Sequence, residues 1–520
     1  MFSAGRLARR SFSPFLLHTL LLCALAGPLL APATFAQRRS ADDSKRDLKL
    51  GRKLLANGRN DDAEKLYRRM LAARPDLSAA KVELAFTLLR QRHIRAAYDL
   101  AFEVARAEPN NARAYAVLGT VLLTAGRFDD ARPVLLTAVS LDRGEDLAWA
   151  GLGRLNFYEN RIEEGLGNLR EAVFLQPTEP DYLYALGQVA ARAEYYREAA
   201  DAYRRFLSVA RDIEDDRRQR IKGLVGFLSY LGQRDELYVT GGPPSATVPI
   251  DLVGNRPIIS LKLNNDPRVF RFVLDTGSGM TVVSDRTAAA LNIRPITKGG
   301  YAKGIGGDGR FEIVYGFVRS VAIGDVRVRN VPVYIRRFHS DTEAIDGYIG
   351  LSLISKFLTT IDYGLLTFAL AKKDSAAPVN SGHTLPLRLT SSGFLSGEVQ
   401  LEGLESPLNF IVDTGASVSV ISEEIAQSEP FSTFARGTPM RVIGAAGVTD
   451  DVPSLELPRV RFGPHSRDRL TAIALNLGLI NESSGFEQAG ILGGNFLRNY
   501  RLTFDFKNSK VTFAPIGAPK

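Results

Sequence analysis

Residues 272–279 read Phe-Val-Leu-Asp-Thr-Gly-Ser-Gly, an apolar run that leads into a carboxylate, a hydroxyl and two glycines. This pattern predicts a buried strand that ends in a tight turn and presents Asp275 there. It returns at residues 410–417 as Phe-Ile-Val-Asp-Thr-Gly-Ala-Ser, with Asp413 in the equivalent place. A pair of carboxylates is the minimum equipment for acid–base hydrolysis by water. The duplication therefore predicts one site built from two halves.

Two further elements follow each aspartate in the same order. The first is a glycine-rich turn between strands, a hairpin tip that can reach over a cleft. The second is a pair of apolar residues and a glycine, which lets a strand pass close behind the aspartate turn. The turns contain Gly304, Ile305, Gly306 and Gly307 in the first copy and Gly444, Ala445, Ala446 and Gly447 in the second, and the apolar elements end in Ile349–Gly350 and Leu492–Gly493.

The region around both copies alternates with a period of about two residues, which is typical of β-strands. Residues 248–250 and 258–263 precede the first aspartate run, and residues 385–387 and 394–401 precede the second in the same way. This half of the chain is therefore predicted to be all-β, with two similar lobes.

This motif set resembles the pepsin/retropepsin superfamily of aspartic proteases, and most closely its retropepsin-like bacterial branch. The resemblance implies that Asp275 and Asp413 form a catalytic dyad around one water, and that Thr276 and Thr414 brace the two loops against each other. It also implies that the glycine-rich turns are flaps. The supporting residues in the two loops are Gly277 and Ser278 in the first lobe and Gly415 and Ala416 in the second.

Two adjacent carboxylates cannot both ionise, so one is expected to act as the acid and the other as the base. Ser278 has a hydroxyl where the second lobe has Ala416. A hydroxyl bonded to Asp275 would favour its ionised form, so we hypothesise that Asp275 is the base and Asp413 the acid. The mechanism needs no metal or cofactor, and the five histidines show no ligand spacing.

A different period occupies residues 47–211. Leucines recur there every 34 residues, each followed by glycine or alanine: Leu50, Leu84, Leu118, Leu152 and Leu186. The pattern predicts a pair of helices per unit and resembles the tetratricopeptide repeat family. Five units and a capping helix would form an α-solenoid. Its groove is interpreted as a site for a protein or peptide partner, and the alternative is a support for the neighbouring domain.

The N-terminal 36 residues are typical of a secretory signal, with Arg6, Arg9 and Arg10 before an apolar run at 15–27. We expect cleavage after Ala36 and a secreted or periplasmic protein; the alternative is an uncleaved anchor. No other segment predicts a membrane span. The net charge of +9 is spread along the chain, which argues against nucleic acid as a partner.

The predicted order is a signal peptide (1–36), helical repeats (45–236), a linker (237–247), β lobe 1 (248–371), a second linker (372–382) and β lobe 2 (383–516). The prediction is an aspartic endopeptidase whose repeats recruit a polypeptide substrate or partner. Because both lobes lie in one chain, we expect an intramolecular dyad and a monomer, rather than pairing of lobes between chains. The alternative function is an inactive scaffold that binds peptides and in which the repeats are the working part.

Overall fold

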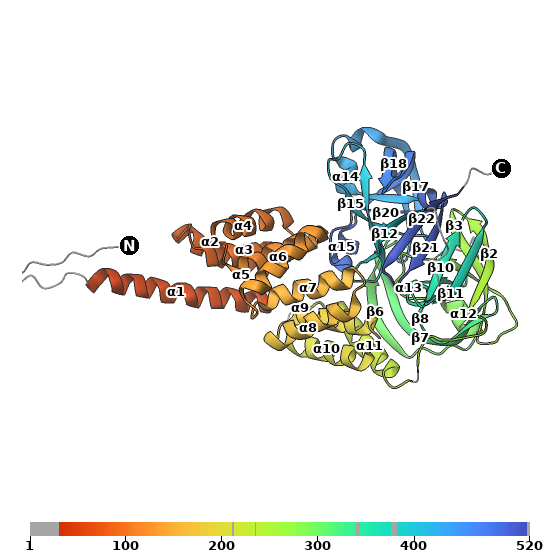
Figure 1. Ribbon diagram of the computed structural model, residues 1–520, viewed down its shortest axis with the longest axis horizontal. Helices are drawn as coiled ribbons and strands as arrows, with labels where there is room; N and C mark the ends of the chain where they lie inside the picture. The colour runs from red at the N-terminus through yellow and green to blue at the C-terminus, as the bar shows by residue number, and fades with distance from the viewer. Residues whose placement is uncertain (1–30, 211–212, 235, 340–343, 376–381, 517–520) are drawn as a thin grey trace, which may run out of the picture.

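A computed structural model describes residues 31–210, 213–234, 236–339, 344–375 and 382–516. The predicted signal segment lies mainly outside these residues. Figure 1 shows an arm of helices that leads into a body of β-strands. The predicted fold class, an α-solenoid followed by an all-β region of two lobes, is confirmed.

The arm consists of five antiparallel helix pairs and one further helix. The second helices of the pairs begin at residues 60, 94, 128, 162 and 196, each 34 residues after the one before. Small residues let the paired helices approach closely: a Cβ on Gly51 would lie 2.3 Å from the Tyr67 ring. The helices are α1 (Ala31–Ala56), α2 (Asn60–Ala73), α3 (Ser78–Arg90), α4 (Ile94–Ala107), α5 (Ala112–Thr124), α6 (Phe128–Leu141), α7 (Asp146–Tyr158), α8 (Ile162–Leu175), α9 (Pro180–Arg192), α10 (Tyr196–Val209) and α11 (Asp215–Leu231).

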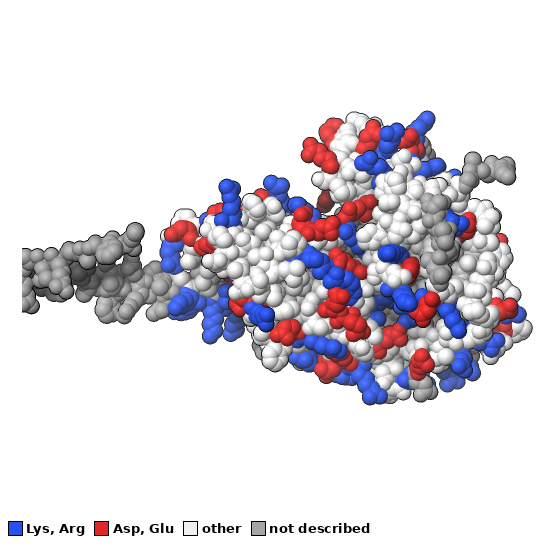
Figure 2. Space-filling model, in the orientation of Figure 1, with Lys and Arg blue, Asp and Glu red and all other residues white. Residues whose placement is uncertain are grey.

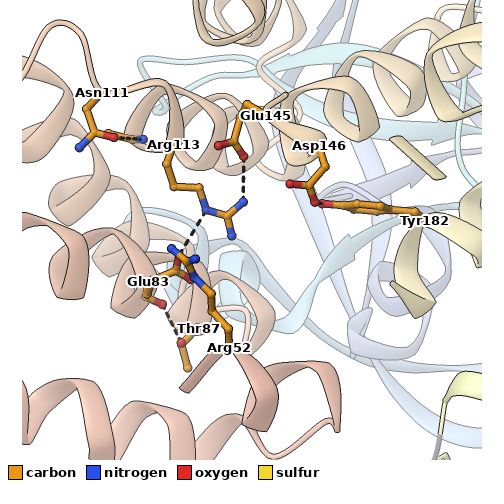
Figure 3. A network of polar contacts seen from close by, with 9 residues as sticks. Arg52, Glu83, Thr87, Asn111, Arg113, Glu145, Asp146 and Tyr182 are labelled. Carbon is orange, nitrogen blue, oxygen red and sulfur yellow. Dashed lines mark hydrogen bonds and ion pairs between the residues drawn. The ribbon is translucent and has the colours of Figure 1, made fainter. Parts of the chain in front are cut away.

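A polar network ties the first helices of successive pairs together (Figure 3). Arg113 donates to Glu145 at 2.9 Å and lies 3.4 Å from Glu83, which also pairs with Arg52 at 2.9 Å. Burial disfavours the charge of Arg113, but the carboxylates of Glu83 and Glu145 outweigh it and raise the pKa of Arg113. The charged Arg113 side chain therefore pairs with residues of the neighbouring repeats and fixes their relative positions.

The two lobes share one strand order, as the duplicated sequence predicts. In lobe 1 the order is β3-β4-β9-β5-β8-β7-β6, and in lobe 2 it is β14-β15-β20-β16-β19-β18-β17. The strands of lobe 1 are β2 (Ser245–Val253), β3 (Arg256–Leu263), β4 (Phe270–Leu274), β5 (Val282–Ser284), β6 (Thr297–Lys303), β7 (Arg310–Ile323), β8 (Val326–Arg336), β9 (Gly347–Ile349), β10 (Phe357–Asp362) and β11 (Thr367–Lys372). Those of lobe 2 are β12 (His383–Pro386), β13 (Arg388–Leu389), β14 (Leu395–Leu401), β15 (Leu408–Val412), β16 (Ser419–Ser422), β17 (Ala435–Ile443), β18 (Val448–Phe462), β19 (His465–Leu475), β20 (Gly490–Leu492), β21 (Tyr500–Asp505) and β22 (Lys510–Pro515).

The closing strands of both lobes join a single sheet. Strand β10 of lobe 1 pairs antiparallel with β21 of lobe 2, and Thr360 lies opposite Thr503. Their hydroxyls are 3.1 Å apart. The lobes are thus fastened to each other by continuous hydrogen bonding rather than by a flexible joint.

The segment predicted as a linker, 237–247, differs from that expectation. Strand β1 (Val239–Gly241) pairs with β8, and β2 already begins at Ser245. Leu237 and Tyr238 bury their side chains in the β core. The glycines and prolines of segment 237–247 indicated a break between strands, but the apolar residues beside them attach the segment to the β core.

The helical arm docks on the β body through the turns within its helix pairs. Arg92, Gly126, Asn160 and Glu194 occupy the same turn position in four successive pairs, each with positive φ. Arg92 pairs with Glu487 of lobe 2, and Glu194 pairs with Lys356 of lobe 1. Asn160 donates to the Phe506 carbonyl at 3.0 Å, and the Gly126 backbone lies against Asn409.

Phe486 anchors this interface. It belongs to lobe 2 in sequence but packs in the hydrophobic core of the repeats, where it is fully buried. Its ring lies 4.9 Å from that of Phe128 and 5.1 Å from that of Tyr158. The arm and the body therefore share a core, which the predicted boundary between them did not anticipate.

Basic and acidic side chains are interspersed over the face of the molecule in Figure 2. This agrees with a positive charge that is spread along the chain. Among the described residues, no helix is both long enough and apolar enough to cross a membrane.

Candidate active site

The two aspartates stand at the ends of equivalent strands. Asp275 follows β4 and its amide donates to the Ile349 carbonyl at 3.0 Å; Asp413 follows β15 and its amide donates to the Leu492 carbonyl at 3.0 Å. The two loops face each other closely, since a Cβ on Gly277 would lie 2.4 Å from the Asp413 carboxyl carbon. The structure thus brings together two residues that are 138 positions apart in the two matching motifs.

The threonines that follow the aspartates cross between the lobes. Thr276 Oγ1 donates to the Val412 carbonyl at 2.6 Å, and Thr414 Oγ1 donates to the Leu274 carbonyl at 2.6 Å. Each hydroxyl also accepts the backbone N–H of the other threonine at 3.1 Å. Both side chains are fully buried. Four hydrogen bonds therefore hold the loops in a symmetrical brace, the arrangement that the resemblance implied.

The two carboxyl groups hydrogen-bond to each other, and their surroundings differ. Burial, and then the negative charge of Asp413, raise the pKa of Asp275 well above its usual range. Burial also raises the pKa of Asp413, but backbone N–H donors oppose it, including Gly415 at 2.7 Å and Ala416 at 3.2 Å. Asp275 accepts one such N–H, from Gly277 at 2.9 Å, so the main chain around the pair favours the negative charge on Asp413.

The hypothesis that Asp275 is the base stays a prediction, and the serine on which it was argued does not support it. The Ser278 hydroxyl donates to the Met280 carbonyl at 2.7 Å, so it is engaged with its own turn. In the other lobe it is the backbone of Ala416 that reaches its aspartate. The side chains at these positions differ in the expected way, but the hydrogen bonds to both aspartates come from the main chain.

The apolar-apolar-glycine elements lie directly behind the aspartate loops. Strand β9 runs parallel to β4, and β20 runs parallel to β15. A Cβ on Gly350 would lie 2.3 Å from the Met280 carbonyl, and one on Gly493 would lie 2.7 Å from the Val418 carbonyl. Only glycine fits at such approaches, which is the reason expected from sequence.

The glycine-rich turns form the tips of two long hairpins that meet. Ala446 donates its N–H to the Ile305 carbonyl at 2.9 Å, and Gly307 donates to the Val448 carbonyl at 3.2 Å. Gly306, with φ of 92°, approaches the backbone of Gly447 so closely that a Cβ there would lie 2.1 Å from its carbonyl oxygen. Ile305 packs against the apolar cluster of lobe 2 that includes Ala416. The two flaps are thus bonded tip to tip.

The last helix of the repeats supports the flap of lobe 1, a contact that the sequence did not predict. Helix α11 packs along β6, and a Cβ on Gly223 would lie 2.2 Å from the Lys298 carbonyl. Phe227 stacks on Tyr315 of β7 with 4.5 Å between ring centroids. Arg310, beside the flap tip, pairs with Asp216 of α11. The only sequence signal was Gly223 and Gly226 within an otherwise apolar helix face.

Comparison with known proteins agrees with this architecture. The aspartyl protease family model matches residues 259–353 and 397–496, one segment in each lobe. Models of the tetratricopeptide repeat match residues 54–121, 112–145 and 151–215. No curated protein matches the chain.

Solved structures resemble separate parts of the chain. A tetratricopeptide protein of Thermus thermophilus is 24% identical, covers 32% of this chain and 91% of its own, and has a TM-score of 0.29. The aspartic proteinase of Irpex lacteus is 13% identical, covers 52% of this chain and 98% of its own, and has a TM-score of 0.37. The family models therefore assign tetratricopeptide repeats to the helical arm and an aspartyl protease region, retropepsin-like, to the two β lobes.

Proposed function

We propose that this protein is an aspartic endopeptidase that hydrolyses peptide bonds with a water held between Asp275 and Asp413. The observation that carries the proposal is the mutual approach of the two carboxyls, in unequal surroundings, on loops braced by Thr276 and Thr414. A pair with one proton contains both a base and an acid at the same place.

The proposed reaction uses each carboxyl once. Asp413, ionised, takes a proton from the water as its oxygen attacks the scissile carbonyl carbon. Asp275 gives its proton to the carbonyl oxygen, so a neutral tetrahedral diol forms. Proton transfer from Asp413 to the amide nitrogen then lets the C–N bond break into an acid and an amine, and Asp275 recovers its proton. Activity should fall at low pH as Asp413 is protonated and at high pH as Asp275 ionises.

The flaps define the shape of the substrate. The Ala446 N–H and the Ile305 carbonyl join the two hairpin tips, so a substrate would have to part the tips and lie beneath them as an extended chain. The two lobes share a sheet through β10 and β21, which supports a dyad within one chain and a monomeric enzyme.

We also propose that the repeats bind a protein or peptide, on the face that is not used for docking. Their turns are occupied by the β body, and Arg113 is committed to Glu83 and Glu145. A partner is therefore expected along other residues of the groove. Because α11 packs against the flap of lobe 1, a partner bound to the repeats would be held on a structure that directly contacts this flap.

Residues 1–36 are proposed to direct secretion or export to the periplasm. The protein recovered outside the cytoplasm should begin at Gln37. An N-terminus still at Met1 on that protein would favour the uncleaved anchor instead.

The function is tested by incubating the protein with an unfolded polypeptide at pH 4 to 7. Cleavage should be blocked by a transition-state analogue of aspartic proteases and lost in both Asp275→Asn and Asp413→Asn. Cleavage that survives either substitution would rule out the dyad. If wild type cleaves nothing, yet all three proteins retain peptides, the scaffold function takes the place of the protease.

A further inference from the structure

Arg336 is a half-buried cation at the end of β8, with a buried Nε and an electrostatic interaction with Asp275. Three rings surround its guanidinium: Phe311 at 5.3 Å, Phe338 at 5.5 Å and Tyr348 at 5.9 Å from the ring centroids. Phe311 touches the lobe 1 flap at Gly304, where a Cβ would lie 2.9 Å from its ring. Tyr348 lies in β9, opposite Val273 of the strand that carries Asp275. The flap and the aspartate strand therefore wall in this arginine.

Within the described part of the chain, the charge of Arg336 has no ion-pair partner. Its buried Nε has no hydrogen-bond partner, and no ion pair joins it to a carboxylate of the described residues. The negative groups whose charge it experiences are Tyr348, should it ionise, and Asp275. A buried charge is costly unless it is paired, so such a residue is usually kept for a ligand or for catalysis.

We propose that Arg336 forms the floor of a substrate subsite in lobe 1 and binds a carboxylate side chain, Asp or Glu, of the polypeptide. This inference rests on the proposed protease function and names its substrate class. The guanidinium presents a planar fork that matches a carboxylate with two parallel hydrogen bonds. The rings fix the plane of the fork and exclude water, which strengthens the pairing.

Arg336 could instead serve only to adjust Asp275, whose pKa it lowers against the larger effects of burial and Asp413. The two roles differ in their dependence on substrate. A subsite cation discriminates glutamate from glutamine at one position of the peptide. A cation that only adjusts the dyad alters the pH profile equally for both.

The experiment uses two peptide libraries that are capped at both ends. Each has a central fixed residue, Glu in one and Gln in the other, with neutral residues randomised on both sides. New amino termini are identified by mass spectrometry, and kcat/KM is compared between the libraries for wild type, Arg336→Gln and Arg336→Lys. Arg337→Gln is the matched control, because Arg337 is the next residue and is exposed.

Wild type and Arg337→Gln should cleave the Glu library about 10- to 150-fold faster, the range expected for a hydrogen bond to a charged group. Arg336→Gln should bring the ratio close to one, and Arg336→Lys should retain part of it because the charge remains. An unchanged ratio in Arg336→Gln would overturn the subsite. So would an equal loss on both libraries together with a shifted pH profile, which would assign Arg336 to the dyad.

Binding separates failure of the subsite from failure of the enzyme. If wild type cleaves neither library, the proposed function fails, and retention of the libraries on Asp413→Asn decides the inference. Asp413→Asn should retain the Glu library more strongly than the Gln library, and the double variant Asp413→Asn/Arg336→Gln should lose this preference; that result supports the subsite. Equal retention of the two libraries contradicts it.

Discussion

Removal of one hydroxyl group breaks half of the four hydrogen bonds by which Thr276 and Thr414 join the two lobes. Thr414→Val keeps the volume and the branched Cβ but removes a fully buried hydroxyl. That hydroxyl donates to the Leu274 carbonyl at 2.6 Å and accepts the Thr276 N–H at 3.1 Å. The substitution therefore leaves two backbone groups of lobe 1 without this partner, in a place that water does not reach.

The cost follows from the number of partners lost. An unsatisfied buried group costs about 1–3 kcal/mol, so Thr414→Val should weaken the brace by about 2–6 kcal/mol. Thr414→Ser keeps both bonds and loses one methyl group, at about 0.8 kcal/mol. The valine variant should thus open its aspartate loops at least about 30-fold more often than wild type, and the serine variant only a few-fold more often.

Hydrogen–deuterium exchange measured on peptides that cover residues 270–280 and 408–418 reports this opening directly. Both peptides should exchange faster in Thr414→Val, because its bonds cross from one lobe to the other. Thr276→Val should do the same, and the double variant should cost less than the sum because the four bonds form one network. Equal exchange in Thr414→Val and Thr414→Ser would refute the brace as the element that joins the loops.

Three further predictions concern the dyad, the flap and the docking interface. Because burial and the Asp413 charge raise the pKa of Asp275, the contribution of Asp275 to folding stability is greatest below the ordinary carboxyl pKa of about 3.9 and is lost as pH rises toward the raised value. Asp275→Asn should remove this contribution, so the difference between wild type and variant in thermal unfolding should change with pH, and a difference that is constant with pH would contradict the raised pKa. Gly223→Val should push β6 away from α11 and alter kcat/KM, while circular dichroism shows that the repeats stay folded. Gly226→Ala is the control and should have little effect, because the new Cβ would lie no closer than 3.5 Å to any neighbouring atom. Equal kinetics in the two variants would mean that α11 does not support the flap. Phe486→Ala should destabilise the docked state by about 3–5 kcal/mol and split one calorimetric transition into two. Phe174→Ala is the control and should leave the transition unchanged, because the Phe174 side chain is 79% exposed. A single unshifted transition in Phe486→Ala would show that the contact does not join the unfolding of the arm to that of the body.

Local patterns were sufficient to predict the two halves of the site. Each half is written within eight residues, and the apolar run, the aspartate and the glycine have local structural reasons. The equivalence of Asp275 and Asp413 followed from duplication, which needs no knowledge of distance. The 34-residue period of the repeats was equally plain, because every unit solves the same packing problem.

Contacts between distant segments could not be predicted in this way. The surroundings of the dyad depend on where the Ala416 N–H and the Ser278 hydroxyl point, which the residue types alone do not give. Phe486 reads as an ordinary loop residue of lobe 2 until its partners in the repeats are known. Arg336 belongs to no motif, and the three rings around its guanidinium come together only in the folded lobe.

The regular spacing of the docked turns limits how this protein can change in length. Arg92, Gly126, Asn160 and Glu194 meet four different places on the β body, so a helix pair inserted among them would shift every later contact by one unit. Gly58, the turn of the first pair, has the same positive φ but precedes this series. Gain or loss of whole repeats is therefore expected only at the N-terminal end of the array, where the arm can be extended to fit new partners without disturbing the flap.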